Sequence, residues 1–185
     1  QYAQFAVAGP NSRRLLEKLI DPKEDISNNA FPFLACGVIF ICGGIKARLF
    51  RISFSGELAY EIAVPARYGN SMMRALMAAG EEFGVTAYGT EALGVMRIEK
   101  GHVAGNELNG QTTARQLGLG RMVSQKKDSI GLVLSRREQM VCDDDYELVG
   151  LKPLDPTISL TAGAHFIAIG AASAAEGGEP RQAFA

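Results

Sequence analysis

The residue best suited to chemistry is a glutamate inside an apolar, strand-like stretch, RISFSGELAYEIAVP at residues 51–65. Glu57 falls in a predicted turn of this stretch, whereas Glu61 lies within the strand that follows. Alternation along a strand places Glu61 on the same face as Ala59 and Ala63, two small residues that leave space above the sheet. A carboxylate in such a position must be paired or bound to a ligand, because removing a lone charge from water is costly.

Two interpretations of Glu61 are open from the residues alone. In the first, the carboxylate forms an ordinary salt bridge with a neighbouring arginine. In the second, it binds an amidine-like edge of a ligand, an N–H group beside an exocyclic NH₂ group. A carboxylate accepts both hydrogen bonds from such an edge, as it does from a guanidinium.

Other reactive side chains show no arrangement typical of a catalytic or metal site. The two histidines, His102 and His165, are far apart in the sequence, so we expect no metal site. The three cysteines have no CxxC spacing, which indicates buried, reduced thiols and a cytoplasmic location. Because nucleophile-elbow, P-loop and dinucleotide-binding motifs are missing from the sequence, the catalytic residues remain unknown.

Composition narrows the class of partner. The net charge of −1 offers no basic surface for nucleic acid, and the chain lacks an apolar run of the roughly 18 residues that cross a membrane. We therefore expect a small-molecule or protein partner, with neither nucleic acid nor a membrane involved.

The elements that position Glu61 alternate between strands and helices. In chain order the sequence predicts a strand at 1–7, a helix at 11–20, two or three antiparallel strands within 31–65, a helix at 68–83 closed by Gly84, and a short strand at 85–88. This β-α-β-β-α-β order predicts an α+β fold, a ferredoxin-like split β-α-β antiparallel sheet. Helices then cover one face of the sheet and leave the other for a partner domain or a ligand.

A long irregular segment follows the next predicted helix, Glu91 to about Lys100. It reads HVAGNELNGQTTARQLGLGRMVS and has neither a helical nor a strand period. Such segments are uncommon in compact domains unless they are functional or disordered, and this one is too rich in Leu, Val and Met for disorder. It is either a connector packed on the sheet or the wall of a ligand cleft, with four candidate hydrogen-bonding residues, Asn106, Glu107, Asn109 and Gln111.

Four segments make up the predicted domain organisation. Residues 1–125 form the main domain and 126–139 a connecting helix, while 140–170 begin a small C-terminal β-barrel unit. The Ala/Gly/Glu-rich tail at 171–185 is expected to be disordered. Since a strand begins at the first residue, we also expect the chain to be a piece of a longer protein.

Two segments carry a resemblance to a known family. They are RISFSGELAYEIAVP and YGTEALGVMRIEKGHVAGNELNGQTTARQLGLGRMVSQKKDSIG. They resemble the aminomethyltransferase-like, folate-binding region of heterotetrameric sarcosine oxidase alpha subunits and, more distantly, the glycine-cleavage T-protein. The resemblance implies that Glu61 binds the amino-pyrimidine edge of tetrahydrofolate, that Phe54 lines the folate pocket, and that Asn106 and Glu107 form a turn beside it.

The same resemblance implies an oxidoreductase function. A domain of this kind accepts the one-carbon unit from oxidised sarcosine, giving 5,10-methylenetetrahydrofolate, in a complex that also holds beta, gamma and delta subunits with FAD, FMN and NAD. The family's catalytic aspartate precedes Gln1, so the isolated chain is expected to be inactive. Leu93 and Gln116 depart from the family pattern, which has arginine and aspartate there. The alternatives are a free-standing aminomethyltransferase of glycine-cleavage type and a non-catalytic subunit-interaction module.

Overall fold

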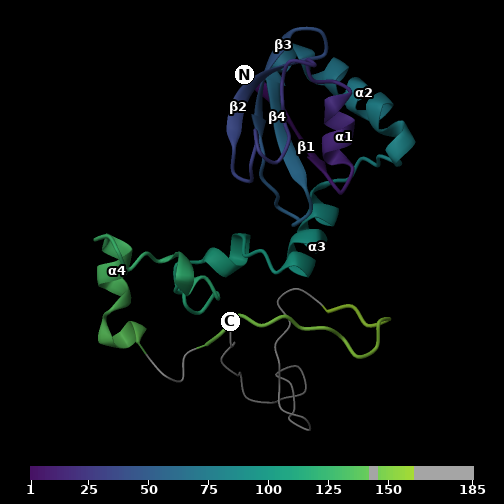
Figure 1. The fold of residues 1–185 in the computed structure, drawn as a ribbon. Coiled ribbons are helices and arrows are strands. Elements are labelled where there is room, and N and C mark those ends of the chain that lie inside the picture. Colours follow the sequence, from purple (N-terminus) through teal and green to yellow (C-terminus); the bar gives the residue numbers. More distant parts are fainter. Residues whose placement is uncertain (142–145, 161–185) are drawn as a thin grey trace. The chain divides into compact units, whose positions relative to one another are not determined.

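An antiparallel sheet of four strands organises the N-terminal part of the chain in a computed structural model (Figure 1). The structure describes residues 1–141 and 146–160, and of Asn106 and Gln139 it describes only the backbone. The strands lie side by side in the order β1 (Tyr2–Ala8), β4 (Ala59–Pro65), β3 (Ile45–Phe50) and β2 (Cys36–Ile41). The central strand β4 therefore pairs on both sides, and Glu61 lies in its middle.

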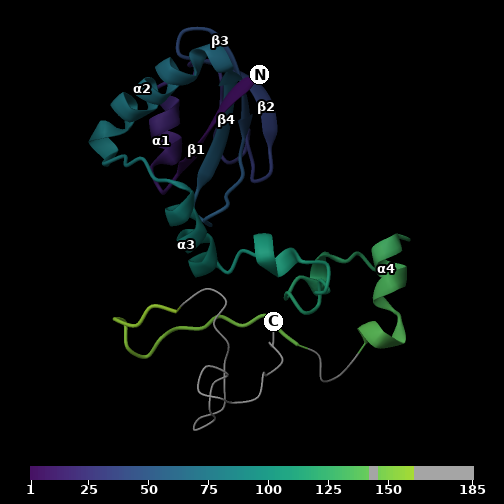
Figure 2. The same cartoon turned by 180° about the vertical axis from the view of Figure 1, so that it is seen from behind.

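Two helices, α1 (Ser12–Glu17) and α2 (Gly69–Gly80), cover one face of the sheet, as the views from both sides show (Figures 1 and 2). Side chains from every second residue of β4 point toward these helices and are completely buried: Tyr60, Ile62 and Val64. They pack against the apolar residues of the helices, chiefly Leu15, Leu16, Met72 and Leu76. The α+β class, with an antiparallel sheet and helices on one face, is confirmed.

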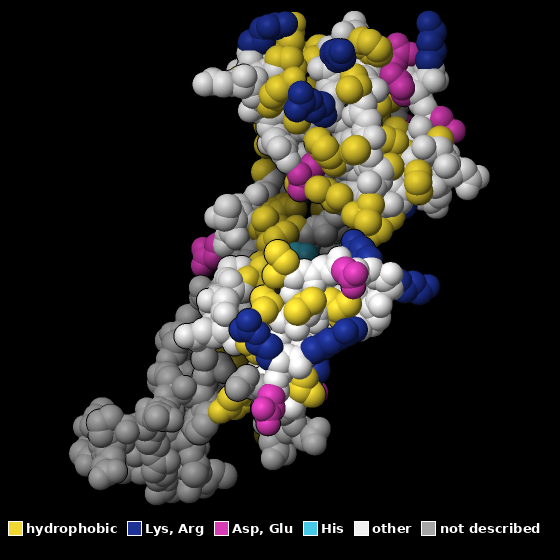
Figure 3. All heavy atoms as spheres, turned by 90° about the vertical axis from the view of Figure 1, so that its left-hand side faces the viewer, with side chains coloured by type: hydrophobic (Ala, Val, Ile, Leu, Met, Phe, Trp, Pro, Cys, Tyr) yellow, Lys and Arg dark blue, Asp and Glu magenta, His cyan; other side chains and the backbone are white. Residues whose placement is uncertain are grey.

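The opposite face of the sheet, called the open face below, carries the alternate residues of each strand. Figure 3 looks onto this face and shows apolar side chains gathered over the strands. Large exposed apolar residues on it include Tyr2, Val38 and Phe40. Cys36 is also exposed, contrary to the prediction of a buried thiol, because position 36 of β2 falls on the open face. Cys42 is partly buried, and Cys142 lies outside the described residues.

The predicted strand at 85–88 does not form, and this prediction was wrong. The amide of Val85 donates to the carbonyl of Gly80, 3.1 Å away, and so completes the C-terminal end of α2. A 3-10 turn, η2 (Glu81–Phe83), and Gly84 in the left-handed conformation lie between them, so the predicted cap at Gly84 is confirmed. The order of the elements from β1 to α2 is β-α-β-β-β-α. The strand that pairs with β1 is β4, which precedes α2.

Short helical elements follow the sheet. α3 (Thr90–Lys100) ends at a left-handed Gly101, and the irregular segment after it contains two 3-10 turns, η3 (Gly105–Leu108) and η4 (Gly120–Met122). Next come α4 (Ile130–Ser135), whose first turn is capped by Ser129, and η5 (Glu138–Met140). A further 3-10 turn, η1 (Ala66–Tyr68), joins β4 to α2.

The chain divides into two compact units, Gln1–Glu147 and Leu148–Ala185. The β-barrel unit predicted at 140–170 is not seen where the structure describes this region, since 146–160 contain no strand. Residues 142–145, 161–170 and the predicted tail at 171–185 lie outside the described residues. Within the part of the chain that is described, no helix has the length and apolar character needed to cross a membrane.

A close contact behind α2 provides a test of the packing. A Cβ atom on Gly80 would lie 2.6 Å from Cβ of Val85 and 2.7 Å from Cδ1 of Leu15, distances that force backbone or core atoms to move. We predict that Gly80→Ala lowers the free energy of unfolding by about 1–3 kcal/mol, the usual effect of overpacking. Urea denaturation followed by circular dichroism measures this change.

Gly94→Ala is the matched control, because Gly94 lies within α3 and a Cβ there meets nothing within 4 Å. It should leave stability unchanged or raise it by up to about 1 kcal/mol through helix propensity. Equal stability of the Gly80→Ala variant and the parent would contradict the packing described here.

Candidate functional site

Glu61 lies on the open face, where its carboxylate meets a neutral partner. The side-chain amide Nε2 of Gln4, on β1, donates a hydrogen bond to Oε2 of Glu61. The register pairs Ala6 with Glu61 and Gln4 with Ala63, so Gln4 and Glu61 are diagonal neighbours across the strands. Among the residues that the structure describes, the ion pairs are Lys18–Glu82 and Arg97–Glu107, and neither involves Glu61.

The open face does contain an arginine near Glu61. Arg48, on β3, lies opposite Ala63 and thus shares a face with Glu61. Its guanidinium lies over the ring of Tyr2, 4.5 Å from the ring centroid, in a cation–π contact. The salt-bridge interpretation of Glu61 is therefore not supported, and the carboxylate retains acceptor capacity for further donors.

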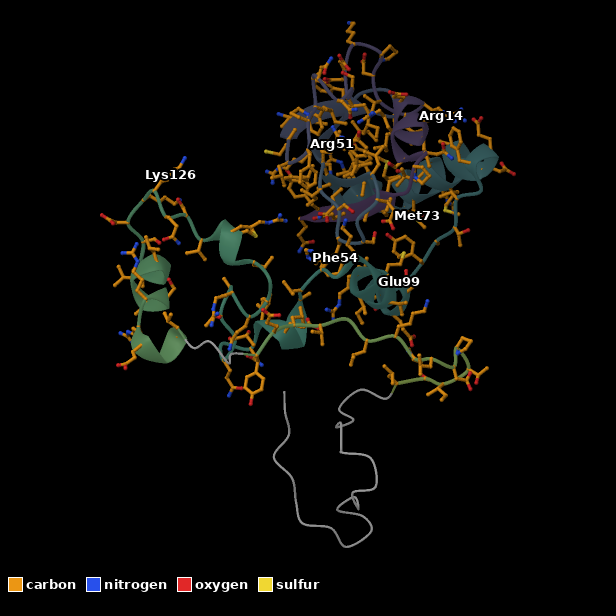
Figure 4. The ribbon with its side chains drawn as sticks, turned by 60° about the horizontal axis from the view of Figure 1, so that its bottom comes forward. Arg14, Arg51, Phe54, Met73, Glu99 and Lys126 are labelled. Atoms are coloured by element: carbon orange, nitrogen blue, oxygen red, sulfur yellow. The ribbon has the colours of Figure 1, made fainter. Side chains whose placement is uncertain are left out.

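Phe54 lies in the connection between β3 and β4, beside the end of α3 (Figure 4). Its ring is 39% exposed and makes an edge contact with His102, with the ring centroids 4.9 Å apart. Another side chain of this connection, Glu57, is close to Tyr88, the residue two positions before α3. Burial raises the pKa of the Tyr88 hydroxyl, and the negative charge of Glu57 raises it further.

Glu107 is held in place by two donors. Nη1 of Arg97 lies 2.8 Å from Oε2 of Glu107, and the amide of Ala104 donates to the same oxygen at 3.0 Å. Burial by itself raises the pKa of Glu107. The hydrogen bonds from Arg97 and Ala104, helped by the charge of Arg97, outweigh burial and leave the pKa below its ordinary value of 4.5. The carboxylate thus anchors the turn η3 onto α3.

The structure brings two of the four predicted site residues into one contact network. Nη1 of Arg97 donates to Glu107 and, at 3.3 Å, to the carbonyl of His102, whose ring touches Phe54. The contacts described for Glu61 run to Gln4 and do not join this network. Asn106 lies in η3, and its side chain is outside what the structure describes.

Two residues with clear contacts were not identified from the sequence, Gln4 and Arg97. Alternation along β1 could have placed Gln4 on the open face, but its pairing with Glu61 requires the sheet order. Of the other predicted loop donors and acceptors, Asn109 accepts a hydrogen bond from the amide of Gln111 and forms a local turn. No cluster of three or more His, Cys, Asp or Glu suited to a metal ion occurs within residues 1–141 and 146–160.

A cavity of about 560 Å³ lies beside β1, and none of the four predicted site residues lines it. Its walls come from β1, the first turn of α1, α2 and the segment Phe83–Thr90. Two residues of β1 that line this cavity are neighbours of Glu61: Gln4, which donates to its carboxylate, and Ala6, its register partner.

Comparison with known proteins gives consistent results. Residues 1–127 match the family described as GCVT N-terminal domain. The chain is 51% identical over 181 residues to sarcosine oxidase subunit alpha of Rhizobium meliloti (strain 1021), covering 97% of this chain and 18% of that protein. It is 42% identical over 183 residues to sarcosine oxidase subunit alpha of Corynebacterium sp. (strain U-96), covering 98% of this chain and 19% of that protein.

A more distant relative is the mitochondrial dimethylglycine dehydrogenase of Mus musculus, 37% identical over 134 residues, which are 71% of this chain and 15% of that protein. The chain thus spans less than a fifth of the length of each of these relatives. Their names are those of oxidoreductases.

The ion pair between Arg97 and Glu107 yields a prediction about pH. Because folding lowers the pKa of Glu107, its charged form stabilises the fold at pH values above 4.5, and this contribution is lost as the pH falls through the lowered value. Glu107→Gln should reduce the free energy of unfolding near neutral pH by about 1 kcal/mol. The difference from the parent should disappear in acid, as measured by urea denaturation at a series of pH values.

Glu99→Gln serves as the control, since Glu99 is an exposed residue on α3, the helix that carries Arg97. It should change stability little at any pH. A Glu107→Gln deficit of the same size in acid and at neutral pH would show that the carboxylate charge is not responsible.

Proposed function

The chain belongs to the family of the GCVT N-terminal domain, and on this basis we propose that it is the tetrahydrofolate-binding portion of a sarcosine oxidase alpha subunit. In this proposal the domain takes up the one-carbon unit from oxidised sarcosine, so that 5,10-methylenetetrahydrofolate forms. The identity to two sarcosine oxidase alpha subunits, over nearly the whole chain, favours this assignment over a free-standing aminomethyltransferase.

One observation carries the proposal, the environment of Glu61. A carboxylate in the middle of a sheet is paired there with a neutral amide from Gln4, and Arg48, an arginine on the same face, is engaged with Tyr2. A flat heterocycle with an N–H beside an exocyclic NH₂ group offers two donors to such a carboxylate. The amino-pyrimidine edge of a pterin has this pattern, and we assign Glu61 to bind it.

The other predicted residues receive roles that follow from their contacts. Phe54, partly exposed and held edge-on by His102, supplies an aromatic surface for the ligand. Glu107, already bound by Arg97 and Ala104, is proposed to act by holding the turn η3 as a wall of the folate site. Asn106 lies within the same turn and is proposed to contribute to that wall.

Tetrahydrofolate, when bound, supplies the nitrogen atoms that accept the one-carbon unit. The residues of this chain bind and orient it, so the gain in rate comes from holding two reactants close together. The catalytic residue and the sites for FAD, FMN and NAD are not assigned to any residue of this chain. The beta, gamma and delta subunits as partners, and a cytoplasmic location, complete the proposal.

The exposed apolar residues of the open face favour one alternative, a subunit-interaction module without a ligand. Tyr2, Val38 and Phe40 form part of a surface that a partner domain could cover. The two functions differ in whether this face binds folate, and a titration separates them.

Calorimetric titration with tetrahydrofolate, on this chain and on the full-length protein, tests the proposal. We predict that Glu61→Gln weakens binding by about 10- to 100-fold, because a hydrogen bond to a charged group contributes about 1.5–3 kcal/mol. Glu17→Gln is the control: this glutamate is exposed on α1, on the other side of the sheet, and its replacement should leave binding unchanged.

Circular dichroism spectra of both variants establish that the fold is retained. Full-length protein that does not bind tetrahydrofolate, or that binds it equally well with Gln at position 61, would overturn the proposal and favour the interaction module.

A further inference from the structure

The outer edge of β1 presents unpaired backbone groups. Flanking hydrogen bonds show the orientation of the strand: the amide of Gly9 donates to Leu58, and Gln1 accepts from the amide of Ala66. Because backbone groups alternate in direction along an antiparallel strand, the odd-numbered residues face β4 and the even-numbered ones face away. Gln4, Ala6 and Ala8 therefore direct their N–H and C=O groups outward, where the described residues provide no backbone partner.

The opposite edge of the sheet, on β2, is protected. Ile20 forms a bridge with Ile41, and the amide of Asp21 donates to the carbonyl of Phe40. The carboxylate of Glu24 accepts from the amide of Phe40 at 3.1 Å. The chain after α1 thus covers part of the β2 edge. Within residues 1–141 and 146–160 no hydrogen bond of this kind covers the β1 edge, and β1 itself contains no proline or charged residue that would block pairing.

A cavity of about 560 Å³ adjoins the unpaired edge. On the helix side its lining is apolar, with Leu15, Leu76, Met77, Phe83 and Val85. None of the residues that line it is Asp, Glu, Lys, Arg or His. The cavity therefore suits an uncharged, apolar occupant, and the row of outward N–H and C=O groups suits an extended backbone.

We propose that the β1 edge receives an extended strand from another part of the full-length protein, with an apolar side chain at every second position. The strand pairs with the outward groups of Gln4, Ala6 and Ala8, and its apolar side chains fill the cavity between β1 and α2. Relatives more than five times the length of the matched region contain ample chain outside it, since the match covers 18% of the Rhizobium meliloti protein. This inference does not depend on folate binding.

Two other occupants fit less well. The segment Val85–Tyr88 already lines the cavity, and the amide of Val85 is bonded to Gly80, so pairing with β1 would break the end of α2. A second copy of the chain would bring a whole sheet against the segment Phe83–Thr90, which forms the far wall. Its own Phe5 and Val7 are packed in its own core and could not fill the cavity.

Hydrogen–deuterium exchange, compared between this chain and the full-length protein, tests the proposal. The amides of Gln4, Ala6 and Ala8 should exchange about 100-fold or more slowly in the full-length protein than in the isolated chain. The amides of Ala3, Phe5 and Val7, which face β4, should be protected in both.

A variant strengthens the test. Ala8→Pro removes one outward N–H and leaves the bonds to β4 in place, so in the full-length protein it should reduce the protection of Gln4 and Ala6. Ala8→Ser retains the amide and should not. Equal exchange of these amides in the two proteins would overturn the proposal. Protection in the isolated chain would also overturn it, indicating a second copy if it rises with concentration, or the segment Val85–Tyr88 if it does not.

Discussion

The burial of one face of β4 is the constraint on which the rest of the structure depends. Tyr60, Ile62 and Val64 are inaccessible to solvent, so the strand can pair with its neighbours in only one phase of the side-chain alternation. A shift of one residue would place Glu61 against the helices and expose the largest core side chain, that of Tyr60. Because a charged group without partners is strongly disfavoured in a core, the hydrophobic effect on one face determines the position of the carboxylate on the other.

A second set of contacts holds the irregular segment after α3. Arg97 lies on the last turns of the helix and reaches both the carbonyl of His102 and the carboxylate of Glu107. The Nη1 nitrogen can serve both acceptors because it carries two hydrogen atoms. The chain that leaves α3 is thereby turned back beside the connection between β3 and β4, and the aromatic contact between Phe54 and His102 lies at their junction.

Sequence patterns predicted the elements whose cause is local. The helices, the cap at Gly84, and the face on which Glu61 lies follow from periodicity and capping, and the family resemblance was confirmed by comparison. The strand predicted at 85–88 was wrong because β-propensity cannot reveal that the Val85 amide is used to end α2. The contact between Gln4 and Glu61, which are 57 residues apart, depends on the sheet order, and the link between Arg97 and Glu107 depends on the turns at Gly101 and η3.

The exposed thiol of Cys36 gains significance from the register of the sheet. Cys36 pairs with Phe50, and Phe50 pairs with Glu61, so the three form a transverse row on the open face. Two strand spacings, about 10 Å, separate the sulfur-bearing residue from the carboxylate. An alkylating reagent attached there would stand beside the surface to which we propose that a flat heterocycle binds. The protein therefore contains a native reporter position, at which the speed of covalent labelling records whether the row is shielded.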